Sequence, residues 1–101
     1  METFEKTYNN DTLDIVIKDD SIGLTNLNDL SGIVSSELGT DCKTINIDFK
    51  NVNSINSSGL GILIACLKKA KSMDKELKLV NLNDKVLNVF KITKLDTVFG
   101  L

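Results

Sequence analysis

The chain has 101 residues, of which 42% are hydrophobic and 26% charged, the size and composition of one ordinary globular domain. It contains no histidine and no proline, and all 12 basic residues are lysine, so a histidine relay, a histidine-ligated metal and an arginine finger are excluded. A net charge of −2 argues against a nucleic-acid partner, because phosphate binding needs clustered basic residues in excess.

The apolar residues are distributed as in a cytoplasmic protein. The N-terminus lacks the apolar region of a secretory signal, and the longest apolar run, from Leu60 to Leu67, is far shorter than the roughly 20 residues that a membrane span needs. Cys42 and Cys66 are too few for a disulfide framework and are expected to be free thiols. We therefore expect one domain over residues 1–101, cytoplasmic and without membrane insertion, and we expect it to be a monomer.

The first third of the chain predicts a hairpin followed by a helix. Phe4 to Tyr8 and Leu13 to Ile17 favour strands, and the Asn and Asp residues at 9–11 favour a turn between them. Apolar residues then recur at three-to-four spacing from Leu24 to Leu38, which predicts an amphipathic helix. Gly39 follows in the position that favours a left-handed cap.

The remainder alternates strands with helices. Thr44 to Phe49 has the clean alternation of a half-buried strand, and a loop rich in Asn and Ser follows it. We predict four further elements, namely a helix over Gly59–Met73, a strand over Leu77–Val80, a helix over Asp84–Ile92 and a short strand over Thr97–Phe99. This order favours an α/β sandwich with helices packed on a mixed sheet of about five strands.

The segment from Asp48 to Leu67 carries the functional information and reads D-F-K-N-V-N-S-I-N-S-S-G-L-G-I-L-I-A-C-L. One interpretation of Ser57 and Ser58 is that they cap the helix that follows. A second interpretation starts from Gly59 and Gly61, since glycine in a helix costs about 1 kcal/mol relative to alanine. Their small size would leave the Ser58 hydroxyl accessible, and a helix N-terminus tolerates an anionic group. The competing interpretation is that the glycines only allow close packing of the helix on the sheet.

The order of elements and the S-I-N-S-S-G-L-G-I-L segment resemble the STAS domain, the fold of bacterial anti-sigma factor antagonists. The resemblance runs over nearly the whole chain. It implies that Ser58, at the second hydroxyl position of the motif, is the phosphorylation site. It also implies a partner-binding segment made of Asn56, Ser57, Ser58, Gly59, Leu60, Gly61 and Ile62.

The partners implied by this resemblance are an anti-sigma factor that is also a serine kinase, and a phosphatase that resets the switch. The unphosphorylated protein would bind the anti-sigma factor and so release a sigma factor for transcription. The kinase would supply ATP and Mg²⁺, so the chain itself needs no cofactor or metal.

The alternative is a STAS scaffold or subunit of a transporter or sensory complex, in which Ser58 is never modified. An enzyme that uses Ser58 with a lysine base is disfavoured, because the sequence places no lysine beside that hydroxyl.

Several further residues are possible contributors to the site. The family usually has aspartate where this chain has Asn56, and a second aspartate at the position that our alignment gives to Gly23. Asp48, at the end of a predicted strand, either supports the site or is a solvated strand end. We expect Cys66 to be a small core residue. The lysines at 68, 69 and 71 are compatible with a helix C-terminus and are either solvated or help to dock an acidic partner.

Overall fold

The computed structural model describes residues 4–18, 21–22, 27–40 and 42–101. Its main sheet has four strands in the spatial order β1-β2-β4-β6. Strand β1 pairs antiparallel with β2, whereas β2, β4 and β6 run parallel, so the sheet is mixed. The strands span Phe4–Asn9 (β1), Thr12–Ile17 (β2), Thr44–Asp48 (β4) and Glu76–Val80 (β6).

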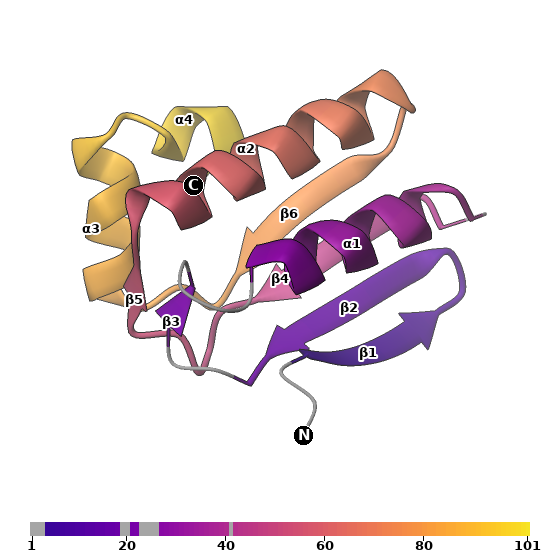
Figure 1. Ribbon diagram of the computed structural model, residues 1–101, viewed down its shortest axis with the longest axis horizontal. Coiled ribbons are helices and arrows are strands. Elements are labelled where there is room, and N and C mark those ends of the chain that lie inside the picture. The colour runs from indigo at the N-terminus through magenta and orange to yellow at the C-terminus, as the bar shows by residue number, and fades with distance from the viewer. Residues whose placement is uncertain (1–3, 19–20, 23–26, 41) are drawn as a thin grey trace.

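Two helices make the crossovers that parallel strands require. Helix α1 (Leu27–Leu38) connects β2 to β4, and α2 (Ser57–Ser72) connects β4 to β6. They contact each other and lie along the sheet (Figure 1). A second, two-stranded parallel sheet joins β3 (Ser21–Ile22) to β5 (Ser54–Ile55), and the chain ends in α3 (Asp84–Ile92) and α4 (Asp96–Phe99).

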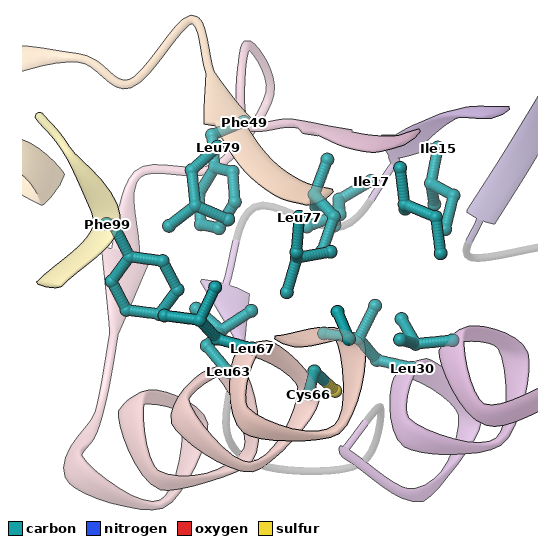
Figure 2. Packing of buried hydrophobic residues seen from close by; sticks show 14 of the residues in the cluster. Ile15, Ile17, Leu30, Phe49, Leu63, Cys66, Leu67, Leu77, Leu79 and Phe99 are labelled. Atoms are coloured by element: carbon teal, nitrogen blue, oxygen red, sulfur yellow. The ribbon is translucent and has the colours of Figure 1, made fainter. Parts of the chain in front are cut away.

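The core lies between one face of the sheet and the two crossover helices. Alternate residues of the strands are buried, as the period of a strand requires, and Figure 2 shows them facing Leu30 of α1 and Leu63 and Leu67 of α2. Phe99 of α4 closes the side of this core, with its ring 5.6 Å from that of Phe90 in an edge-to-face arrangement. The buried strand residues are Phe4, Leu13, Ile15, Ile17, Ile45, Ile47, Leu77 and Leu79.

The opposite face of the sheet is mostly polar and only partly buried or exposed. Asn46 of β4 donates a hydrogen bond to Asp14 of β2 at 2.9 Å, and Lys78 pairs with Glu76 on β6 at 3.3 Å. Since alternate side chains of every strand point to this face, burial of the other face determines the register of the whole sheet.

A buried carboxylate fastens the edge strand β1 to α1. Glu37 is 7% exposed, accepts a hydrogen bond of 2.6 Å from the Tyr8 hydroxyl, and lies 3.5 Å from the Lys6 ammonium. Tyr8 and Lys6 pair in register with Leu13 and Ile15, whose side chains enter the core. Tyr8, Lys6 and Glu37 therefore form a polar cluster at the border of the apolar core, on the side of β1 that faces α1.

Most of the elements predicted from the sequence are confirmed, including the hairpin, both crossover helices, the strands of the sheet, and the Asp84–Ile92 helix with its predicted limits. The prediction of Thr97–Phe99 as a strand is wrong, because these residues form α4, whose exit is a left-handed Gly100. The main sheet consequently has four strands instead of about five. Gly39 is not left-handed, so the predicted cap there is also wrong. Both cysteines are free, as expected, and both are buried, which was expected only of Cys66.

The single tyrosine of the chain allows a direct test of the Glu37 cluster. The hydrogen bond to Glu37 raises the pKa of Tyr8, with burial and the carboxylate charge acting in the same direction. The pKa of an unfolded tyrosine is about 10. As the pH rises, Tyr8 therefore loses its proton in the unfolded chain before it does so in the native protein, and the free energy of unfolding falls above that pH. We expect the phenolate absorbance at 295 nm to rise at higher pH in the native protein than in urea. An equal or lower native midpoint would show that the contact does not exist in solution.

Candidate functional site

The start of α2 is fixed by an asparagine. Asn56 has extended backbone angles and its side-chain oxygen accepts a hydrogen bond from the Gly59 N–H at 2.8 Å, so Asn56 is the N-cap of the helix. Ser57 and Ser58 are the first two helical residues, and the interpretation of these serines as caps is wrong. Within the described residues, neither serine hydroxyl makes a hydrogen bond.

The seven residues predicted to bind a partner divide between surface and interior. Ser58 lies on the surface at the first turn of α2, with Ile62 half-buried one turn further along. Leu60 points inward and is 6% exposed, because it belongs to the core. The exposed members of the set are Asn56, Ser57, Ser58 and Gly61, and the buried members are Gly59 and Leu60.

Gly61 adds to the openness of this surface. It is exposed, and no atom lies within 4 Å of the position that a Cβ there would take. Gly61 is therefore not needed for packing within the described part of the chain, although glycine weakens the helix. This observation agrees with the interpretation that small residues keep the surroundings of Ser58 accessible.

Asparagines hold the two loops that surround the start of α2, at the edge where the parallel strands end. Asn83 donates to the Val52 carbonyl at 2.9 Å and to the Asn53 side chain at 3.1 Å, and its own oxygen caps α3 by accepting from the Val86 N–H at 2.9 Å. Asn51 donates to the carbonyl of Ile17 at 3.2 Å. These side chains satisfy backbone groups that the loops leave unpaired.

Asp48 belongs to the same framework. One carboxylate oxygen accepts from the Lys50 N–H at 2.8 Å and the other accepts from the Asn81 side chain at 3.1 Å. Asn81 has φ of 57°, a conformation that asparagine tolerates better than most residues. Asp48 therefore links the loop after β4 to the loop after β6. This is a positioning role in the framework around the site, made through a partner, Asn81, that the sequence did not identify.

Sequence reasoning also missed Asn81 and Asn83. Asn83 directly precedes the predicted helix at Asp84, which is the usual signal of an N-cap. Its contacts to the loop before α2 join residues about 30 positions apart, and no local pattern encodes such a pairing. Gly23, together with the nearby Asp19 and Asp20, lies outside the described residues.

Cys66 is buried on α2, and burial raises the pKa of its thiol. Its burial confirms its place in the core, and a thiol with a raised pKa forms little thiolate. Among the described residues, no group of three or more acidic, cysteine or histidine side chains is placed to hold a metal ion. The same residues include no helix long and apolar enough to cross a membrane.

A protein-family model described as the MlaB, STAS domain matches residues 19–101, which include the start of α2 and every element after it. The chain belongs to the STAS domain family.

The anti-sigma-B factor antagonist of Staphylococcus aureus is 34% identical over 53 residues, 52% of this STAS chain and 49% of that protein. The anti-sigma-B factor antagonist of Bacillus subtilis is 32% identical over 66 residues, 65% and 58% of the two chains. The chain thus spans about half the length of the curated relatives it matches.

Solved structures agree with the family assignment. The crystal structure of a candidate anti-sigma factor antagonist from Thermotoga maritima superposes with a TM-score of 0.80 at 26% identity, covering 94% of this chain and 81% of that one. SpoIIAA in its unphosphorylated form has a TM-score of 0.77 at 17% identity over 97% of both chains. The murine anion transporter Slc26a9 has a TM-score of 0.71 at 14% identity, with 85% of this chain matching 14% of the transporter. The last two likenesses concern the fold alone.

The division of roles at the start of α2 can be tested by unfolding in urea. Asn56→Ala should lower the free energy of unfolding by about 1 kcal/mol, as loss of an N-cap typically does. Asn56→Asp should preserve it, because aspartate caps as well as asparagine and its charge suits a helix N-terminus.

Ser58→Ala is the matched control for this prediction, since its hydroxyl is exposed and unbonded, and its effect should stay within about 0.5 kcal/mol. A larger loss of stability in Ser58→Ala than in Asn56→Ala would contradict the assignment of the cap.

Proposed function

We propose that this STAS domain is an anti-sigma factor antagonist whose docking surface is the start of α2 and whose switch is phosphorylation of Ser58. The unphosphorylated form binds an anti-sigma factor that is also a serine kinase, and so releases a sigma factor for transcription. Phosphorylation ends the interaction, and a separate phosphatase restores it. Because the cycle needs ATP and a sigma factor, we place the protein in the cytoplasm, and we propose that it acts as a substrate and not as an enzyme.

The observation that carries this proposal is an unbonded, exposed hydroxyl at the first turn of a long helix. Asn56 satisfies the Gly59 N–H, which leaves Ser58 without a structural task. A serine that was itself the cap would have to rearrange that hydrogen bond when modified. Ser58 can instead accept a phosphate without loss of any hydrogen bond in the described fold. The curated antagonists of two bacteria and their shared family support the same assignment.

The chemistry requires little from this chain. The Ser58 oxygen attacks the γ-phosphorus of ATP, its proton passes to a base, the bond between the γ-phosphorus and the bridging oxygen breaks, and ADP leaves. The chain has no histidine or arginine, so we assign the base, the Mg²⁺ ion and the phosphate-binding groups to the kinase. This chain contributes the hydroxyl and a rigid, accessible position for it.

The phosphate would act on docking by its charge. It adds about −1.5 to −2 charges at pH 7, on a surface that otherwise presents Ser57, Gly61 and half-buried Ile62. The first turn of α2 contains no acidic residue, and the lysines of the helix lie in its second half. Burial of such an anion without a cation beside it costs several kcal/mol, and each 1.4 kcal/mol is a tenfold change in affinity.

The second candidate function is a STAS subunit or scaffold of a transporter or sensory complex that uses the same surface with Ser58 unmodified. The observation that favours it is the likeness in fold to a transporter that contains a STAS-like portion. The two candidates differ in a single measurable respect, which is whether Ser58 receives phosphate.

Incubation with ATP, Mg²⁺ and the anti-sigma factor kinase of the same genome should add one phosphate to the protein, and site mapping should locate it on Ser58. Ser58→Ala should abolish the mass increase, whereas Ser57→Ala should retain it. If the family's aspartate assists phosphoryl transfer, Asn56→Asp should also accelerate the modification.

The binding measurement completes this test. Ser58→Asp should bind the kinase at least tenfold more weakly than the wild type, with an unchanged urea midpoint, because the added charge lies in the docking surface and not in the core. Equal binding of Ser58→Asp and wild type would exclude the charge switch. Tight binding of the wild type without any phosphate transfer would favour the scaffold.

Gly61 provides an independent test of docking. Gly61→Ala should stabilise the isolated domain by about 0.5 to 1 kcal/mol, because alanine favours helix and its methyl group meets no atom of this chain. The same methyl should weaken binding to the kinase if the partner approaches the helix closely.

Gly32 of α1 is the matched control, since it is also exposed, helical and free of neighbours within 4 Å of a Cβ. Gly32→Ala should produce the same gain in stability without a change in affinity. A Gly61→Ala variant that binds as tightly as the wild type would show that the partner does not approach α2 at this turn.

A further inference from the structure

Helix α2 has the opposite charge to the chain that contains it. It has no Asp or Glu between Ser57 and Ser72, but it has three lysines, at positions 68, 69 and 71. The chain as a whole carries a net charge of −2. None of the three lysines forms a salt bridge with any residue that the structure describes. The second half of α2 is therefore an unneutralised basic surface.

Two of these lysines continue the face that begins at Ser58. Exposed positions recur along α2 at helical spacing, at Ser58, Gly61, Ala65, Lys68, Lys69 and Ser72. The buried positions, such as Leu63 and Leu67, lie on the other side and pack on the sheet (Figure 2). A rise of 1.5 Å per residue puts Lys68 about 15 Å along the helix from Ser58. One face of α2 therefore carries small neutral residues at its start and positive charge at its end.

We propose that Lys68 and Lys69 form a second docking point, which binds an acidic surface of the same anti-sigma factor kinase about 15 Å from its contact with Ser58. This inference rests on the proposed function and names the chemistry of the partner. The spacing exceeds the Debye length of about 8 Å at physiological ionic strength, so a phosphate on Ser58 leaves the lysines largely unneutralised. The phosphate acts at one end of the helix, and the lysines guide association at the other.

A protein partner fits this surface better than a membrane or a nucleic acid. Polybasic segments that bind anionic lipids have about four to eight basic residues, whereas α2 has three exposed lysines. A nucleic acid would meet a chain of net negative charge. A flat helix face with small neutral residues beside two cations is instead suited to close packing against another folded surface with complementary charge.

The test is the association rate of the kinase with the double variant Lys68→Glu/Lys69→Glu. At low salt the rate should fall about tenfold, because reversed charges repel the acidic surface during encounter. At 0.5 M salt the difference from the wild type should almost vanish. Lys91→Glu/Lys94→Glu is the matched control, since it also reverses two exposed lysines, in and just after the last turn of α3 and outside α2. It should leave the association rate within about twofold of the wild type.

Combination with Ser58→Asp separates the two docking points. Because the points act independently, the fold losses in affinity of Ser58→Asp and of the lysine variant should multiply in the combined variant. An unchanged association rate in the Lys68→Glu/Lys69→Glu variant, or an equal loss in Lys91→Glu/Lys94→Glu, would overturn the inference. The inference would also be overturned if the wild type bound phosphatidylserine vesicles, the lysine variant did not, and the two proteins bound the kinase with equal affinity. A wild-type protein that does not bind the kinase would instead refute the proposed function.

Discussion

Burial of a single face of the sheet determines where Ser58 lies. Parallel strands need crossovers, and because the apolar side chains of β2, β4 and β6 all lie on one face, both crossover helices must cover that face. Each helix therefore begins at the edge where the strands end. The first turn of α2 lies at that edge. Its inward residues Gly59 and Leu60 are buried, whereas its outward side, which carries Ser58, is exposed and available to a partner.

Asparagine side chains hold the loops of this edge together. The loops after β4 and β6 contain no proline, so their conformation depends on hydrogen bonds from Asn51, Asn81 and Asn83. An asparagine has both a donor and an acceptor, and Asn83 uses both by capping α3 and holding the Val52 carbonyl. The loop that leads to Asn56 is thereby attached to the start of α3. The position of Ser58 is thus supported by the C-terminal part of the chain as well as by β4.

The sequence was most informative where a repeating pattern fixes both structure and burial. Alternation in Thr44–Phe49 and the spacing in Asp84–Ile92 predicted elements whose observed limits differ by one residue or none. The shortest predicted segment failed. Thr97–Phe99 has β-favouring residues, but Phe99 reaches the core from a helical turn, where it contacts Phe90 edge to face. Three residues cannot show a period, so tertiary packing decides their conformation.

At the candidate site too, features encoded by neighbouring residues could be predicted, whereas contacts between residues far apart in the sequence could not. The glycine-flanked serines predicted an accessible hydroxyl, and the structure confirms its exposure. Sequence reasoning considered only Ser57 and Ser58 as caps, although Asn56 is an equally good capping residue. The structure identifies Asn56 as the cap, because its backbone is extended and its side-chain oxygen accepts a hydrogen bond from the Gly59 N–H, whereas Ser57 and Ser58 are already helical. The positioning role of Asp48 depends on Asn81, 33 residues away, and was beyond local reasoning.

A phosphate at this place would have opposite effects on folding and on docking. At a helix N-terminus the backbone N–H groups favour negative charge by roughly 0.3 to 1 kcal/mol, so the isolated domain should be unaffected or slightly stabilised. In a complex the same anion would be removed from water beside half-buried Ile62, with no arginine in the chain to pair with it. The unfavourable desolvation of several kcal/mol then exceeds the favourable helix effect. Asn56 is what separates the two effects, because the cap that holds α2 together is not the group that receives the charge.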